Sequence, residues 1–225
     1  MQADNRAIHA VGGMPLNVIT ANSLQTPEGV LSLQLTPAKT IEAQIFALFQ
    51  AYPISSVKIG MLGGAPQVQA VVESLKQESD AFIVLDPVIQ SSSGSPLLDQ
   101  PGLSLLNSEL LPLVDLVTPN TEECKKLKLR NATAVLYKGG HSGGANAVDK
   151  LVFRGGQSKS FSKPRVDSPN LRGTGCTLSS AIAAYVALGD STISACERAK
   201  NLLDKSLHTN ADLKFHGEGP AFISS

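Results

Sequence analysis

Three polar residues with different chemistry stand at or just after the ends of short apolar runs in this sequence. They are an acid, Asp86, an amide, Asn120, and an amine, Lys138. If the runs are parallel strands, the three side chains lie near one edge of a sheet, where the functional residues of such sheets collect. Asp and Asn also end strands for conformational reasons alone, but the three together favour a functional edge. The runs are Phe82–Asp86, Val114–Thr118 and Ala134–Lys138.

A glycine-rich segment, Gly173–Cys176, precedes a long run of small and apolar residues that predicts a helix. A helix N-terminus carries unpaired N–H groups and partial positive charge, and glycines let the backbone approach an anion closely. We interpret the segment as an anion hole for a phosphoryl group under transfer. A purely structural interpretation also exists, because the alanines that follow would let a glycine-capped helix pack tightly against its neighbours.

The elements that must position these residues alternate between apolar runs and helical patterns. This alternation predicts an α/β fold with a mostly parallel sheet and helices on both of its faces. Two further strands are expected at Val18–Thr20 and Val57–Gly60, and a hairpin joins Leu151–Phe153 to Ser160–Phe161 through Gly155-Gly156. The expected helices are Ile41–Gln50, Pro66–Ser79, Pro101–Leu111, Glu122 to about Leu129, Thr177–Leu188 and Ser191 to about Asn210.

Length and composition limit the possible functions. The chain has 225 residues, which predicts one domain over residues 1–225. Lys+Arg and Asp+Glu number 19 each, and no basic cluster appears, so we expect no nucleic-acid partner. The three cysteines show neither metal spacing nor a disulfide pattern, which is typical of a reducing cytoplasm. We recognise no signal peptide and no apolar run long enough to cross a membrane.

Seven stretches together resemble the hydroxymethylpyrimidine and phosphomethylpyrimidine kinases of thiamine biosynthesis, in the ribokinase-like superfamily. They follow the family's order along nearly the whole chain. The combination of GTGCTLS with KIGML is quite specific, because sugar kinases of the superfamily usually carry Asp where Cys176 stands. The stretches are QAD at 2–4, VITA at 18–21, KIGML at 58–62, LDPV at 85–88, TPNTEE at 118–123, KGGH at 138–141 and GTGCTLSSAIAA at 173–184.

The resemblance implies a three-layer ribokinase-like fold, a homodimer and a kinase reaction with ATP and Mg²⁺. ATP would phosphorylate the hydroxymethyl group of 4-amino-5-hydroxymethyl-2-methylpyrimidine, and a second ATP would convert the monophosphate to the diphosphate. The family roles match single positions here. They place Asp4, Gln25, Met61 and Val88 at the pyrimidine, Asn120, Lys138, Gly173 and Gly175 at the nucleotide, Asp86 and Glu123 at magnesium, and Cys176 with Gly173, Thr174 and Gly175 at the reacting phosphoryl group.

Several of these roles have structural alternatives. Met61 and Val88 could equally be core residues, and Glu123 could be an exposed carboxylate in the first turn of a helix. Cys176 stands at the superfamily's catalytic-base position, and a helix N-terminus can lower the pKa of a thiol. Because phosphoryl transfer depends more on positioning than on a strong base, we expect Cys176 to position the substrate first. Cys124 and Cys196 are expected to be inert packing residues.

The sequence departs from the family pattern at three places. An apolar strand and a glycine-rich turn normally precede the Gln-Ala-Asp stretch, and their loss would remove one wall of the substrate site. The segment between Glu123 and Ala134 is short, with room for barely one crossover helix. Arg172 stands where histidine is common, either reaching a phosphate or lying as a solvated loop cation. Two other functions stay open: a pyridoxal kinase of the same branch, and a catalytically silent homologue that binds nucleotide or a partner.

Overall fold

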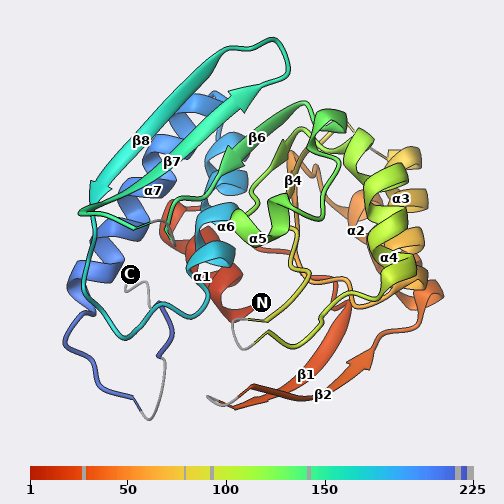
Figure 1. Ribbon diagram of the computed structural model, residues 1–225. Coiled ribbons are helices and arrows are strands. Elements are labelled where there is room, and N and C mark those ends of the chain that lie inside the picture. The colour runs from red at the N-terminus through yellow and green to blue at the C-terminus, as the bar shows by residue number, and fades with distance from the viewer. Residues whose placement is uncertain (27–28, 79, 92–93, 141–142, 216–218, 222–225) are drawn as a thin grey trace.

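A six-stranded sheet forms the middle layer of the computed structural model (Figure 1). The structure describes residues 1–225 except 27–28, 79, 92–93, 141–142, 216–218 and 222–225. The first four strands are parallel, and the last two form the antiparallel hairpin that the sequence predicted, at one edge of the sheet. In sheet order the strands are β3 (Ser56–Ile59), β4 (Phe82–Leu85), β5 (Leu116–Val117), β6 (Ala134–Tyr137), β7 (Asn146–Phe153) and β8 (Ser158–Pro164).

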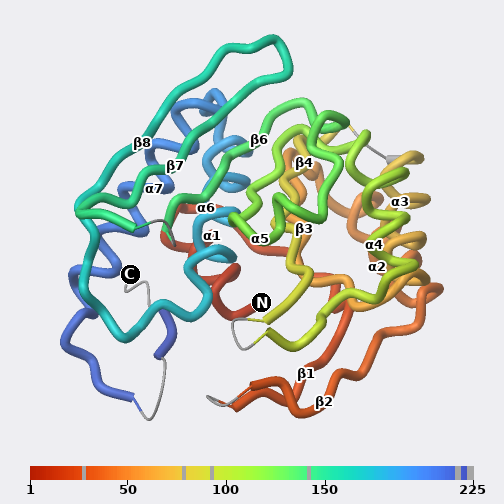
Figure 2. The backbone as a smooth tube through the Cα atoms, in the orientation of Figure 1, coloured from red at the N-terminus to blue at the C-terminus, as the bar shows by residue number. Residues whose placement is uncertain are grey.

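Helices cover both faces of this sheet, as Figures 1 and 2 show. Two separate clusters of buried apolar residues, one with each set of helices, form the core. The sequence-based prediction of a three-layer α/β fold with a mostly parallel sheet is therefore confirmed. On one face lie α2 (Ala38–Ala51), α3 (Ala65–Glu78) and α4 (Gln100–Leu105), and on the other lie α1 (Gln2–Val11), α6 (Thr174–Ala187) and α7 (Thr192–Thr209).

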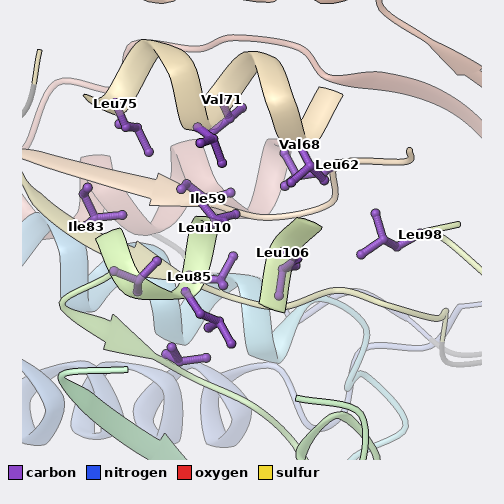
Figure 3. Packing of buried hydrophobic residues seen from close by; sticks show 14 of the residues in the cluster. Ile59, Leu62, Val68, Val71, Leu75, Ile83, Leu85, Leu98, Leu106 and Leu110 are labelled. Carbon is purple, nitrogen blue, oxygen red and sulfur yellow. The ribbon is translucent and has the colours of Figure 1, made fainter. Parts of the chain in front are cut away.

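The spacing of apolar residues along α3 explains how this helix packs. Val68, Val71 and Leu75 recur at intervals of three and four residues, so they form one stripe of the helix. Figure 3 shows this stripe directed at the side chains of the neighbouring strands, among them Ile59 and Ile83. All five side chains are buried.

Helix α6 is buried along most of its length because other helices flank it. Every residue from Thr177 to Tyr185 is buried, and α1 and α7 both pack against this helix. Small residues such as Ala181, which is fully buried, permit this close approach. The alanine-rich run therefore does serve tight packing, as the structural interpretation of the glycine-rich segment required. That role leaves the N-terminal turn of α6 available for other chemistry.

The strand expected at Val18–Thr20 is wrong. Residues 13–19 take no regular secondary structure, and the strand β1 (Ala21–Thr26) begins one residue after this run. β1 pairs with β2 (Gly29–Leu35) in a separate antiparallel ribbon, visible below the main sheet in Figure 1. Val18 instead packs against the core, and the Thr20 hydroxyl donates to the Met61 carbonyl at 2.6 Å. A short β-favouring run becomes a strand only where a partner backbone lies beside it.

The helix expected from Glu122 to about Leu129 is also wrong, because α5 spans only Thr121–Cys124. The Asn107 side chain binds the backbone of the segment in which this helix would continue. Its Nδ2 donates to the Lys126 carbonyl at 3.1 Å, and its Oδ1 accepts from the Lys128 N–H at 2.6 Å. A short 3-10 turn then covers Leu129–Asn131.

The other expected helices are confirmed with shifted ends, apart from Ser79, which lies outside the described residues. The segment Pro101–Leu111 is helical but continues from α4 into a π turn at Leu106–Leu110 and a 3-10 turn at Leu111–Leu113. Helix α1 was not predicted, although Ala3, Ala7 and Val11 share a face and Gly12 ends the helix with φ +95°. None of the described helices is both long and apolar enough to cross a bilayer.

Candidate active site

An ion pair joins the ends of β4 and β6. Lys138 Nζ lies 2.8 Å from Asp86 Oδ1, and Asp86 is only 2% exposed. The parallel ladder places both residues, because the Asp86 N–H donates to the Ile59 carbonyl and the Lys138 N–H donates to the Pro119 carbonyl. Burial alone would raise the pKa of Asp86, but Lys138 and Lys58 lower it below its usual value. The acid and the amine at these strand ends are thus direct neighbours.

Helix α5 begins beside this pair with a capping box. Asn120 Oδ1 accepts from the N–H groups of Glu122 and Glu123, and Glu123 Oε2 accepts from the Asn120 N–H at 2.7 Å. Glu123 is 5% exposed, so the alternative of an exposed first-turn carboxylate is wrong. Glu123 Oε2 also lies 3.9 Å from Lys138 Nζ. Burial raises the pKa of Glu123 to about 7, although Lys138 opposes this shift.

The first turn of α6 faces the same ion pair. Gly173 precedes the helix with φ +83°, and no side chain in the described part of the chain caps it. A Cβ on Gly175 would lie 3.2 Å from Lys138 Nζ and 3.6 Å from Asp86 Oδ2. The glycine therefore brings the backbone of α6 directly against the charged groups, and the N–H groups of Gly175 and Cys176, in the first turn, have no intrahelical partner.

A second ion pair also lies against α6. Lys58 Nζ, at the carboxyl end of β3, is 2.7 Å from Asp4 Oδ1, and the Ser180 hydroxyl donates to the same oxygen at 2.8 Å. Burial alone would raise the pKa of Asp4, but Lys58 lowers it well below its usual range. Sequence reasoning missed Lys58 as a site residue. The available signal was a lone lysine in the otherwise apolar run that ends at Gly60.

Burial raises the pKa of the Cys176 thiol, contrary to the lowering expected from its place at a helix N-terminus. Lys58 opposes this shift, while Asp86 and Asp4 add to it. Desolvation is the largest cause of this rise in pKa, and it disfavours the thiolate form. All three cysteines are free. Cys196 is buried, as expected of a packing residue, whereas Cys124 is partly exposed.

The three other residues predicted at the pyrimidine, Met61, Val88 and Gln25, differ in their surroundings. Met61 and Val88 are partly buried and belong to neither core cluster, which disfavours the alternative of core residues. The Val88 N–H donates to the Asp86 carbonyl at 2.8 Å, so Val88 borders the charged groups. Gln25 is exposed on β1, and no hydrogen bond of its side chain appears among the described residues. His141 of the KGGH stretch lies outside the described residues.

Arg172 is not simply a solvated loop cation, because its side chain is partly buried and hydrogen-bonded to the backbone; its contact with a phosphate stays a prediction. Its guanidinium donates to the Thr26 carbonyl at 2.8 Å and so ties the entrance of α6 to the end of β1. Thr26 lies 146 positions away from Arg172 in the sequence. Arg172 therefore connects the β1–β2 ribbon, which carries Gln25, to the glycine-rich segment.

The carboxylates suit a magnesium ion that keeps much of its water. Among the described residues, no group of three or more His, Cys, Asp or Glu could hold a metal by itself. Mg²⁺ is commonly held by one or two carboxylates together with waters and substrate phosphates, and Asp86 and Glu123 provide such hard oxygen ligands. Two lysines and an uncapped helix N-terminus lie beside these carboxylates, and positive groups of this kind suit a phosphate ligand.

Comparison with known proteins gives concordant results. The chain matches the family described as phosphomethylpyrimidine kinase over residues 1–221. It is 32% identical to the hydroxymethylpyrimidine/phosphomethylpyrimidine kinase of Haemophilus influenzae, over 98% of this chain and 89% of that protein. The crystal structure of phosphomethylpyrimidine kinase from Clostridium difficile 630 is similar, with a TM-score of 0.75 and 33% identity over 89% of each chain. The pyridoxal kinase from Staphylococcus aureus in complex with AMP-PCP shares the fold, with a TM-score of 0.82 and 23% identity over 97% of this chain and 86% of that one.

Proposed function

Because the chain belongs to the phosphomethylpyrimidine kinase family, we propose that it transfers the γ-phosphoryl group of ATP to 4-amino-5-hydroxymethyl-2-methylpyrimidine. It then phosphorylates the monophosphate to the diphosphate. We further propose that residues 1–225 act as one kinase domain. The free cysteines support a cytoplasmic enzyme, and the exposed Leu24 and Leu31 of the β1–β2 ribbon offer apolar surface for a homodimer.

One observation carries this proposal: the uncapped first turn of α6 lies against the Lys138–Asp86 ion pair. Transfer of a phosphoryl group depends mainly on positioning and on stabilising charge spread over its oxygens. The N–H groups of Gly175 and Cys176 and the ammonium of Lys138 supply positive charge to those oxygens. Asp86 and Glu123 would hold Mg²⁺, which neutralises phosphate charge when it is bound.

Burial strengthens the electrostatic effect of Lys138 and Asp86. The Lys138 side chain is 14% exposed, and that of Asp86 is 3% exposed. Burial alone would lower the pKa of Lys138, but Asp86 and then Glu123 raise it above its usual value. Lys138 therefore remains an ammonium ion throughout the physiological pH range. A charge held in surroundings of low dielectric constant acts on a bound phosphate more strongly than the same charge in water.

On the acceptor side, we propose that Asp4, Met61 and Val88 form the pyrimidine pocket, with Gln25 contributed by the β1–β2 ribbon. Lys58 and Ser180 both bind Asp4 Oδ1, which fixes the orientation of the carboxylate. Cys176 positions the substrate hydroxyl, because its raised pKa leaves little of the thiolate that would be needed to accept the proton. Asn120 acts on the nucleotide indirectly, since its side chain caps α5 and places Glu123.

A steady-state assay of ADP release tests this function. The purified protein receives ATP, Mg²⁺ and either the hydroxymethylpyrimidine, its monophosphate or pyridoxal. The proposal predicts a higher kcat/KM for both pyrimidines than for pyridoxal. Preference for pyridoxal would instead establish a pyridoxal kinase. Binding of AMP-PCP without turnover of any of the three compounds would establish a silent nucleotide-binding homologue.

A further inference from the structure

A third buried ion pair lies between α7 and β7. Lys200 Nζ is 2.7 Å from Asp149 Oδ2. Asp149 is 3% exposed and Lys200 is 8% exposed, so both charges have largely lost their hydration. Neither residue belongs to the group that we place at the reacting phosphoryl.

The other oxygen of Asp149 binds the backbone next to Lys138. The Gly139 N–H donates to Asp149 Oδ1 at 2.8 Å, and the Lys138 N–H donates to the Pro119 carbonyl at 3.0 Å. Gly139 must be a glycine, because a Cβ there would overlap the Val148 carbonyl oxygen. The N–H groups of Lys138 and of Gly139 are thus held by the segment that follows β5 and by a side chain of β7.

Stability alone is a weak explanation for this pair. Taking two charges out of water is costly, and well-packed apolar residues often serve stability equally well. A carboxylate does, however, accept a stronger and shorter hydrogen bond from a backbone N–H than a neutral group does. The Lys200 ammonium binds Asp149 Oδ2 at 2.7 Å and so orients the carboxylate whose other oxygen accepts from the Gly139 N–H.

We propose that Lys200 and Asp149 are positioning residues for phosphoryl transfer. Through the Gly139 N–H, they hold the end of β6 so that the Lys138 ammonium stays against Asp86 and the first turn of α6. This inference rests on the proposed kinase function. It predicts that the pair acts on the nucleotide side of the reaction and leaves pyrimidine affinity unchanged.

Two double variants separate this role from simple packing. Asp149→Leu with Lys200→Met replaces both charged groups with apolar side chains and removes the acceptor of the Gly139 N–H. Asp149→Asn with Lys200→Gln keeps a neutral acceptor and a hydrogen-bonding partner for it. We expect the apolar pair to lose about 10- to 100-fold in kcat, the size of effect that small displacements of reacting groups produce. Its Kd for AMP-PCP rises while its KM for the pyrimidine stays constant, and the neutral pair recovers most of the loss.

The matched control is Asp190→Asn with Arg198→Gln, which removes a more exposed ion pair that involves the same helix. It should leave kcat and AMP-PCP affinity unchanged. The ¹⁵N–¹H resonance of Gly139 provides a direct readout, because an amide proton that donates to a carboxylate lies downfield. We expect this resonance to move upfield in the apolar pair, remain near its position in the neutral pair and stay unchanged in the control.

A folded apolar pair with normal kcat and AMP-PCP affinity would overturn the inference, as would a neutral pair as impaired as the apolar one. If the apolar pair does not fold, Asp149→Asn alone replaces it, with a smaller loss expected on the nucleotide side. A moved Gly139 resonance with unchanged AMP-PCP affinity in that variant would also overturn it. If the wild-type protein turns over no pyrimidine, the proposed function fails, but AMP-PCP affinity and the Gly139 resonance still test the positioning role.

Discussion

Helices α5 and α6 begin at the same edge of the sheet, and their first turns are built differently. In α5, the Asn120 side chain accepts from two backbone N–H groups, and Glu123 accepts from a third. In α6, Gly173 takes the N-cap position, and no described side chain caps the turn. A first turn whose N–H groups are occupied stabilises the fold, whereas one whose N–H groups are open can bind an anion. Lys138 lies between them, near Glu123 and Gly175.

The largest effect is expected from closing the open turn. In Gly175→Val, the new side chain would occupy the space beside Lys138 Nζ, 3.2 Å from its Cβ position. Loss of such backbone donors typically costs 10²–10³-fold in kcat, and we expect about 10³-fold here. Gly175 does not have a positive φ, so the valine variant should fold.

Gly173→Val, at φ +83°, should also lose turnover but adds backbone strain. Gly155→Val, with open space around the new Cβ, is the matched control. Normal kcat in folded Gly175→Val would exclude the anion hole.

Removing the charge between the two helices should have the next largest effect. Lys138→Met keeps most of the aliphatic stem but leaves Asp86 and Glu123 without the ammonium ion. We expect kcat to fall about 10²-fold, and calorimetry should show weaker AMP-PCP binding with little change in pyrimidine binding. The control is Lys125→Met, which removes an exposed lysine that pairs with Glu122 of α5. It should change neither kcat nor AMP-PCP binding. Lost pyrimidine affinity with intact AMP-PCP affinity would reverse the assignment of the two subsites.

Removing the cap of α5 should act mainly on stability. Asn120→Ala removes the acceptor of two N–H groups, and urea unfolding should show a loss of about 1 kcal/mol. Asn120→Asp should keep the cap, because aspartate is as good an N-cap residue as asparagine. We expect Asn120→Ala to raise the KM for ATP only modestly. A loss of turnover as large as in Gly175→Val, without a loss of stability, would mean that Asn120 binds the nucleotide directly.

The smallest effect is expected at Cys176. Because burial raises the pKa of this thiol, the fraction of thiolate at neutral pH is small, and the hydroxyl of Cys176→Ser can still hydrogen-bond to the substrate alcohol. We expect kcat within about tenfold of wild type, below the 10²–10⁴-fold that general-base catalysis contributes. The rates of the wild-type protein and of the serine variant should depend on pH in the same way. A loss of about 10³-fold, with such a change in the pH profile, would identify Cys176 as the base.

The sequence alone determined those features that depend on neighbouring residues. Alternating apolar and helical patterns identified four of the main strands, the hairpin and most helices, because strand and helix periodicity are local properties. It also placed Asp86 and Lys138 at strand ends, since parallel strands share a carboxyl edge. The Asn120-x-x-Glu123 spacing is that of a capping box, and the structure contains one.

Only the tertiary structure decided which distant groups meet and how much water they lose. Asp4 and Lys58 are 54 residues apart, Asn107 ends α5 from another helix, and Arg172 reaches Thr26 across 146 positions. Burial of Cys176 reversed the direction of pKa shift that its helix position had suggested. Periodicity indicates which side of an element is buried, but desolvation and charge pairing depend on every element packed around a residue. A local pattern therefore cannot specify them.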